Sequence, residues 1–239
     1  MKRGMKISAM AALALAMGAV SATPAAALVT VSVGAAGATS ASVAGYNFAV
    51  DTLNNATNGL PSITFGTSGI TGTSSDFVNI YNANVYGGAG GTGQFGTITG
   101  NTTIQLSQSV NYFGLWGSAL DWNNTVELYN GNALLGSYAL QNVLQSSPGY
   151  NASYLGNPFM AGTGDEQYAF FNFMSNAAFD RVKLVQNGGG GFEFDNLTVG
   201  TVSAAPEPAT WAMLLIGFGA IGWLLRGQAG VPVRRRMAG

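Results

Sequence analysis

Between residues 28 and 205 the chain consists of short runs of β-branched and aromatic residues separated by glycine and asparagine. Glycine and asparagine adopt the positive φ angles that tight turns require. We find no sustained apolar stripe with a period of 3.6 residues, which a helical domain would need. Many short strands with turn signals between them predict an all-β domain, and a β-sandwich in particular. The expected strands lie near residues 28–33, 46–50, 62–65, 76–80, 102–106, 110–116, 125–129, 133–139, 167–173, 180–186 and 192–199.

Two turns and one irregularity stand out in this pattern. The segment Asn130-Gly131-Asn132 separates two alternating runs, and Asn-Gly in that setting is a strong signal for a β-hairpin. The glycines at 188–191 predict a second hairpin, between the strand before them and the strand at 192–199. The apolar alternation of that last strand shifts by one position at Asp195-Asn196, which predicts a β-bulge.

The N-terminus has the three parts of a secretory signal. Residues 1–6 form a basic segment with Lys2, Arg3 and Lys6. Residues 7–20 form an apolar segment that is too short to span a bilayer, and small residues follow it. Ala25 and Ala27 fit the cleavage pattern, so we predict cleavage after Ala27, with Ala22 as the alternative. The partners at this stage would be the Sec translocon and signal peptidase. An uncleaved anchor is the remaining interpretation of the segment.

The C-terminus predicts a second targeting element. Residues 209–225 form an uncharged stretch of 17 residues, which as a helix would reach about 25 Å, enough for a thin bilayer. Trp211 and Trp223 stand near its ends, where interfacial aromatic residues belong. We therefore expect a single transmembrane helix here. The positive-inside rule would place the arginines that follow it in the cytoplasm and the middle of the chain on the other side; these are Arg226, Arg234, Arg235 and Arg236.

The residues before this stretch carry a resemblance to a known sorting signal. Pro206-Glu207-Pro208 is followed by Trp211 and Ala212, then by the apolar stretch and the arginines. This tripartite tail resembles the PEP-CTERM sorting signal in its PEPxxWA form. The resemblance implies a Gram-negative bacterium that makes exopolysaccharide, and an exosortase that cleaves at or near the proline motif. The tail would then be a transient inner-membrane anchor, and the processed protein would reach the cell surface or the extracellular matrix.

The middle of the chain carries a second resemblance. Residues 112–118, 122–132 and 194–197 resemble parts of ectodomains often attached to PEP-CTERM tails. That likeness implies a jelly-roll-like antiparallel β-sandwich, similar to carbohydrate-binding modules. The expected domains are a signal peptide at 1–27, an ectodomain at 28–203 and a sorting signal at 204–239. The sorting signal divides into the motif at 206–208, the helix at 209–225 and the basic tail at 226–239.

Composition excludes several kinds of function. The chain has no histidine and no cysteine, which removes histidine-dependent triads, thiol nucleophiles, disulfides and zinc sites built on those residues. Residues 28–205 contain two basic and nine acidic side chains. Nucleic-acid binding needs a basic surface, so we expect no nucleic-acid partner.

Catalysis without histidine would need a pair of carboxylates, as in glycoside hydrolysis. Glu127 and Glu193 lie in predicted strands and are candidates for such a pair. They serve equally well as polar residues on the solvent face of a strand. We expect the protein not to be an enzyme, and a glycoside hydrolase-like activity is the alternative.

No cofactor is required by the sequence, but calcium is a candidate ligand. Calcium prefers oxygen donors from carboxylates, amides and carbonyls in flexible loops. Asp165 and Glu166 stand in a glycine-rich loop, and Asp195 stands beside an asparagine. No EF-hand spacing accompanies these three residues. Plain acidic loop residues are the simpler interpretation of the first two.

The most specific binding candidate is the segment from Asp121 to Asn124. Trp122 could stack on a sugar ring while Asp121, Asn123 and Asn124 bond its hydroxyl groups. We therefore expect an exported surface or matrix protein that is structural or carbohydrate-binding in exopolysaccharide or biofilm. The alternatives are a polysaccharide-acting enzyme and an adhesin that stays anchored in the membrane.

Overall fold

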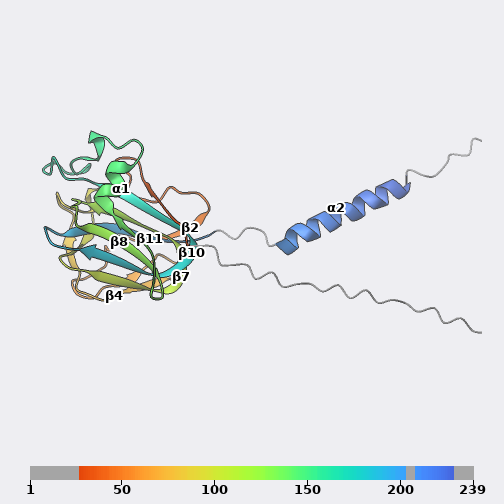
Figure 1. The fold of residues 1–239 in the computed structure, drawn as a ribbon, viewed down its shortest axis with the longest axis horizontal. Coiled ribbons are helices and arrows are strands. Elements are labelled where there is room, and N and C mark those ends of the chain that lie inside the picture. Colours follow the sequence, from red (N-terminus) through yellow and green to blue (C-terminus); the bar gives the residue numbers. More distant parts are fainter. Residues whose placement is uncertain (1–26, 203–207, 229–239) are drawn as a thin grey trace, which may run out of the picture.

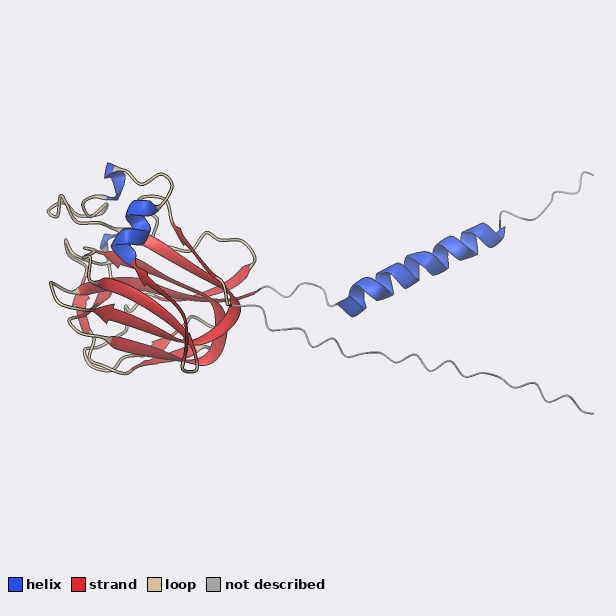
Figure 2. Ribbon diagram, viewed as in Figure 1, coloured by secondary structure: helices blue, strands red, loops and turns tan. Residues whose placement is uncertain are grey.

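The computed structural model describes residues 27–202 and 208–228, and the signal peptide predicted at 1–27 lies almost wholly outside this range. The described part up to residue 202 is dominated by antiparallel strands, shown in red in Figure 2. The strands are β1 Val29–Val33, β2 Tyr46–Asp51, β3 Ser62–Thr64, β4 Thr71–Ser74, β5 Asn79–Asn82, β6 Gln94–Ile98, β7 Thr102–Ser118, β8 Asn124–Asn130, β9 Ala133–Ala139, β10 Ala169–Gln186 and β11 Phe192–Val202. The helices are α1 Leu140–Ser146 and α2 Pro208–Gln228, with short 3-10 turns η1 Ala89–Gly91 and η2 Ala152–Tyr154.

Two long strands, β7 and β10, organise a single sheet. They pair with each other over nearly their whole lengths, and the main path of the sheet runs β5-β6-β11-β7-β10-β8-β9. The register of the pair shifts around Val110 and between Met174 and Arg181, which marks a bend. On one side of the bend the pair is flanked by β11 and β1, and on the other side by β4 and β8. The sheet therefore forms two layers that share β7 and β10 (Figure 1).

The main core lies between these two layers. Its buried apolar side chains come from both, such as Phe113 and Phe171 from the first layer and Leu128 and Leu184 from the second, and they belong to one continuous cluster. Removal of this apolar surface from water is the principal stabilising term for a chain without disulfides. The all-β prediction is confirmed.

A smaller core lies on the outer side of the first layer. It consists of Trp116, Ala119, Tyr168 and Phe170, with Ala41 and Ala89 packed against it from connecting segments. Outer positions of a sheet are usually polar, so this cluster is buried only because loops cover it. One face of the first layer is thus closed by chain that is not part of the sheet.

The two ends of the β-domain lie together. β1 begins with Val29 opposite Ser175, at the bend of β10, and β11 ends two residues after Gly200, which is opposite Tyr112 near the bend of β7. We call this the terminal end. At the opposite end lie the last residues of β7, the first residues of β8 and β11, and the loops that connect to these strands (Figure 1). We call that the loop end.

Local turn signals were predicted well. The hairpin at 130–132 joins β8 to β9, and Gly131 has a φ of 55°. The bulge at Asp195-Asn196 is also confirmed, because the register between β11 and β7 shifts there and Asn196 has a φ of 47°. Both features depend on residues adjacent in sequence, which is why the sequence pattern identified them.

Features set by long-range pairing were predicted less well. The hairpin expected at 188–191 is wrong: β10 ends in the second layer and β11 begins in the first, so the glycines cross between layers. The runs at 102–106 and 110–116 are one strand, and so are 167–173 and 180–186, because the sheet bends without breaking. The strand expected at 76–80 begins at Asn79 instead. The sequence pattern missed β4, β6 and α1.

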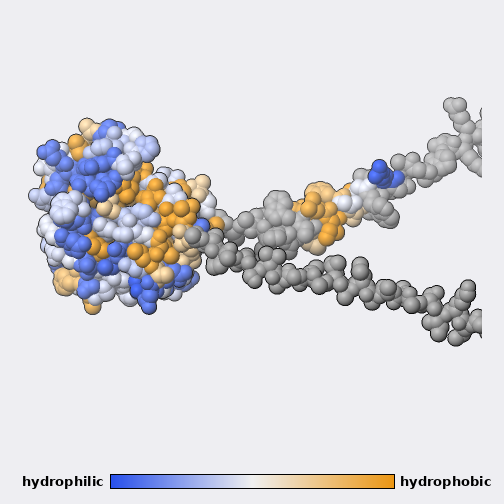
Figure 3. All heavy atoms as spheres, viewed as in Figure 1, coloured by the Kyte–Doolittle hydropathy of each residue, from blue (hydrophilic) through white to orange (hydrophobic). Residues whose placement is uncertain are grey.

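The C-terminal segment forms the helix α2. Pro208 is its first residue, and proline fits the first helical position because no N–H is needed there. Several large apolar side chains of α2 are exposed, as the orange surface in Figure 3 shows. Within the described residues no helix has the length and apolar character needed to cross a membrane, so the span predicted at 209–225 is not confirmed. Pro206, Glu207 and Arg234–Arg236 lie outside the described residues.

We expect Phe113→Ala to destabilise the domain by about 3–5 kcal/mol, because it would empty a fully buried site in the central strand. Phe113 also packs on Phe173, with ring centroids 6.3 Å apart. Urea denaturation followed by tryptophan fluorescence measures the change. Leu134→Ala is the control: Leu134 is 52% exposed, so its loss should shift stability by less than about 0.5 kcal/mol. Equal effects of the two substitutions would contradict the assignment of the core.

Candidate functional site

The loop end brings together two segments that are distant in sequence. The segment after β7 carries Asp121 and Asn123, and the glycine segment crosses from β10 to β11. The backbone N–H of Gly190 donates to Asp121 Oδ2 at 3.2 Å, and Asn123 Nδ2 donates to the carbonyl of Gly188. These bonds fasten the two loops to each other next to the first residues of β11.

Glycine is required where these loops touch. A Cβ at Gly189 would lie 2.6 Å from Asn123 Nδ2, and one at Gly191 would overlap the carboxylate oxygen Oε1 of Glu193. Gly189 also has a φ of 88°, which side chains of L-residues rarely allow. The glycine run predicted as a hairpin turn therefore serves instead to let polar side-chain ends approach the backbone closely.

The negative charges of acidic side chains at this end influence one another. The pKa of Glu193 is raised to about 7, chiefly by burial; a backbone hydrogen bond lowers it, and the negative charges of Asp121 and Glu166 add to the rise. Burial and the charge of Asp121 likewise raise the pKa of Glu166. These are the effects expected of carboxylates that are desolvated beside like charges.

The same end contains buried oxygen atoms that have no hydrogen-bond partner within the described part of the chain. They are Ser118 Oγ, Asn123 Oδ1 and Gln167 Oε1. The amide nitrogens of the last two are both in use: Asn123 Nδ2 bonds Gly188, and Gln167 Nε2 donates to Tyr150 Oη at 2.8 Å. What these side chains lack is therefore a donor or a positive charge, and such groups are uncommon in a folded interior.

The predicted glycan segment divides into an exposed part and a structural part. Trp122 is 75% exposed and Asp121 is half-buried, so both are accessible from solvent. Asn124 is fully buried; it accepts from the N–H of Asp121 at 2.8 Å and donates to the carbonyl of Gly191 at 3.1 Å. Asn123 is buried as well. A bound sugar could reach the first two residues, while the two asparagines hold the loop.

The residues predicted for calcium are separated by the fold. Both carboxylate oxygens of Asp195 accept backbone N–H bonds, from Ala89 at 2.8 Å and from Asn196 at 2.6 Å. Burial raises the pKa of Asp195 to about 7. This side chain ties a covering loop to the sheet, whereas Glu166 is half-buried within range of the charge of Asp121, and Asp165 is exposed. In the part of the chain that is described, no group of three or more acidic side chains is close enough to hold a metal ion by itself.

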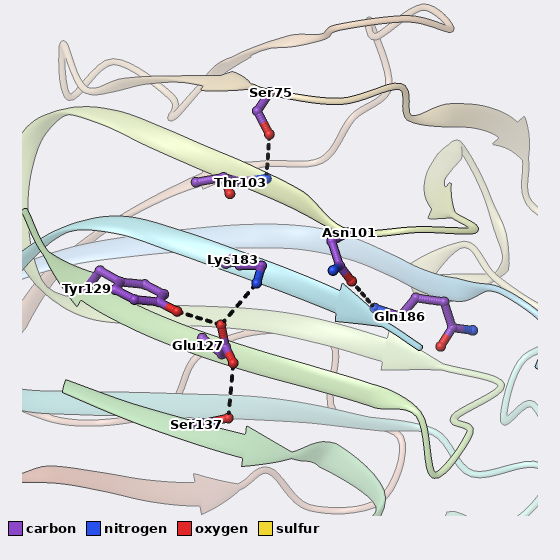
Figure 4. A network of polar contacts seen from close by, with 8 residues as sticks. All are labelled: Ser75, Asn101, Thr103, Glu127, Tyr129, Ser137, Lys183 and Gln186. Carbon is purple, nitrogen blue, oxygen red and sulfur yellow. Dashed lines mark hydrogen bonds and ion pairs between the residues drawn. The ribbon is translucent and has the colours of Figure 1, made fainter. Parts of the chain in front are cut away.

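The two carboxylates predicted as a catalytic pair lie in different layers. Glu127 stands on β8 of the second layer, where Lys183 Nζ lies 3.5 Å from its Oε2 and Tyr129 Oη donates to the same oxygen at 2.7 Å (Figure 4). Ser137 Oγ lies 3.5 Å from its other oxygen. Glu193 stands on β11 of the first layer, opposite Ser118. Glu127 is part of a cross-strand polar network, and the structure does not bring it to Glu193.

The raised pKa of Glu193 predicts a pH dependence of stability. The folded state holds a proton on this carboxyl up to about pH 7, while the unfolded chain loses it near pH 4.3. The free energy of unfolding should therefore fall as pH rises from about 4.3 to about 7, by at most roughly 1.4 kcal/mol per pH unit for this group, and should level off above that. Glu193→Gln should make that fall shallower. Asp195 contributes in the same direction in both proteins.

Urea denaturation at several pH values between 5 and 8 measures this dependence. Asp165→Asn serves as the matched control, since it removes one exposed acid from the neighbouring loop and should leave the slope of the parent protein unchanged. A slope for Glu193→Gln that equals the slope of the parent would show that Glu193 titrates normally in the fold.

Comparison with known proteins identifies the C-terminal segment. Residues 204–228 match the family model described as the PEP-CTERM protein-sorting motif. No curated protein and no solved structure matches the chain, so the jelly-roll topology and the likeness to carbohydrate-binding modules stay predictions. The motif is one that exosortase recognises, and it marks proteins exported to the cell envelope and surface of Gram-negative bacteria. The chain thus carries a PEP-CTERM sorting motif, which follows directly after the last strand of the β-domain.

Proposed function

We propose that this protein is an exosortase-processed component of the exopolysaccharide or biofilm matrix, and that its loop end binds carbohydrate. The observation that carries the proposal is the position of Trp122, whose large side chain is 75% exposed beside the half-buried Asp121. Indole faces stack on the apolar faces of sugar rings, and a carboxylate accepts bonds from sugar hydroxyls.

The loop that carries Trp122 is held in place on both sides. Asp121 accepts the N–H of Gly190, Asn123 donates to Gly188, and Asn124 bonds both Asp121 and Gly191. A binding side chain on a fixed loop loses little conformational entropy when a ligand docks, so its contacts contribute more of their energy to affinity. An exposed tryptophan on such a loop favours a binding role over a packing role.

The position of this loop also suits a protein processed at its C-terminus. β11 ends at the terminal end, two residues before the matched sorting motif begins, and Trp122 belongs to the loop end. Cleavage of the tail near the proline motif would leave the carbohydrate-binding loop untouched. Sorting and binding are therefore assigned to opposite ends of one domain.

Trp122→Ala should weaken retention on exopolysaccharide from the host about tenfold, because the stacking surface is lost. Its melting temperature should stay unchanged, since the side chain is exposed. Affinity electrophoresis in gels cast with the polysaccharide measures retention. Leu134→Ala removes an exposed apolar side chain from the hairpin near the bend and should behave like the parent. Unchanged retention of Trp122→Ala would refute the stacking role, and shortened glycan products would favour the enzymatic alternative.

Replacement of Pro206, Glu207 and Pro208 by alanine should abolish C-terminal processing in the host. Mass spectrometry of the parent should find a protein that begins near Leu28 and ends near Pro208, whereas the variant should keep its final arginines. Val202→Thr, an exposed change just before the motif, should be processed normally. A parent protein with an intact C-terminus would instead support an adhesin that stays anchored.

A further inference from the structure

The polar groups of the loop end are unbalanced in charge and in hydrogen bonding. The charges that act on Glu193 are those of Asp121 and Glu166, all negative. The two bases of residues 28–205, Arg181 and Lys183, lie on β10 in the second layer, where Lys183 pairs with Glu127. Carboxylates that share a partly buried site without a base strongly disfavour being ionised together, unless a cation joins them.

A buried hydroxyl adds to this imbalance. Ser118 is opposite Glu193 in the pairing of β7 with β11, so both side chains project from the same face of the sheet, with Cβ atoms about 5 Å apart. Ser118 is 0% exposed, and its Oγ has no hydrogen-bond partner among the described residues. An oxygen atom with this burial, on the same face of the sheet as Glu193, is an available ligand beside the carboxylate.

The loop above supplies a further neutral oxygen. Asn123 is 5% exposed, and its Nδ2 is fixed on Gly188, which leaves Oδ1 without a partner. The same glycine run brings Asp121 Oδ2 to the N–H of Gly190, and its last residue, Gly191, touches the carboxylate of Glu193. The amide oxygen, the two carboxylates and the hydroxyl thus belong to segments joined around Gly188–Gly191.

We propose that the loop end binds a divalent cation of the calcium type, with Asp121 and Glu193 as its charged ligands and Ser118 Oγ and Asn123 Oδ1 as neutral ones. Glu166 is not a ligand in this proposal, but it adds negative charge nearby. Every free group in this set is an oxygen, which is the donor that hard cations select, and calcium accepts the irregular arrangement that loops provide more readily than magnesium does.

Neutral ligands are necessary for this site. No three acidic side chains within the described ranges converge closely enough to form a metal cage by themselves. Two carboxylates with hydroxyl, amide and backbone oxygens give a weaker site, of the kind found in extracellular modules with dissociation constants of about 0.1–1 mM. The predicted set of Asp165, Glu166 and Asp195 is replaced by this one, because Asp195 is engaged by two backbone amides.

This inference does not depend on carbohydrate binding, although the two are adjacent. Asp121 precedes Trp122 and Asn123 follows it, so a cation on both flanking side chains would fix the loop further. Direct measurement of cation binding separates the two proposals, since a failure of one leaves the other standing.

The test uses the full chain, treated with a chelator and dialysed, and then titrated with calcium chloride. Calcium at 10 mM should raise the melting temperature by about 3–10 °C, and calorimetry should report one site of near-millimolar affinity. Asp121→Asn and Glu193→Gln should each lower the affinity at least tenfold. Asp165→Asn, which removes one acid from the same end, should bind like the parent, and magnesium should bind at least tenfold more weakly.

Two results would overturn the proposal. One is a parent protein that shows neither heat nor a thermal shift with calcium up to 10 mM. The other is a shift that Asp121→Asn and Glu193→Gln retain in full, because it would then arise elsewhere on the acidic surface. Asp121→Asn changes a half-buried loop residue, so it keeps the test decisive even where Glu193→Gln folds poorly.

Discussion

The pairing of β7 with β10 is the interaction on which the rest of the structure depends. These strands run through both layers, and their shared bend near Val110 and Phe179 lets one sheet enclose its own core. Because both strands reverse direction in space at the bend, their far ends return to a common edge. That edge gathers the loops before β8, β10 and β11, which is why residues more than seventy positions apart, such as Asp121 and Glu193, influence each other's charge.

Two buried carboxylates of β11, Asp195 and Glu193, differ in the groups that surround them. Asp195 is satisfied: two backbone N–H groups bond its oxygens, and the side chain fastens a loop over the outer core. Glu193 lies two residues earlier on the same face. The negative charges of Asp121 and Glu166 act on it, and Ser118, whose hydroxyl has no partner among the described residues, lies opposite it. Desolvation acts on both, so the difference lies in the partners. A structural role explains the first carboxylate, and only a ligand or a bound proton balances the second.

The sequence predicted what neighbouring residues determine. Alternation of apolar residues identified most strands, Asn-Gly located the hairpin after β8, and a shift of phase located the bulge at Asp195-Asn196. The same information could not show that two runs were one bent strand, nor that the glycines at 188–191 cross between layers, because those facts depend on which distant strand is the partner. The sorting motif at residues 204–228 was predictable, since it is recognised as a linear segment.

The candidate site shows where that limit falls. Trp122 and Asp121 were identifiable because an aromatic residue flanked by polar ones in a loop is a local pattern. Ser118 gave no signal, as a serine that ends a strand is common, and Glu193 was predicted in a different pair because its true neighbours come from other loops. The glycines were the sequence signal that pointed to these neighbours. A Cβ added at any of residues 189–191 would contact the polar end of a side chain of this site. A run of glycines longer than a turn requires is therefore an indication of close approach between backbone and side chains, and in this chain it lies beside the candidate site.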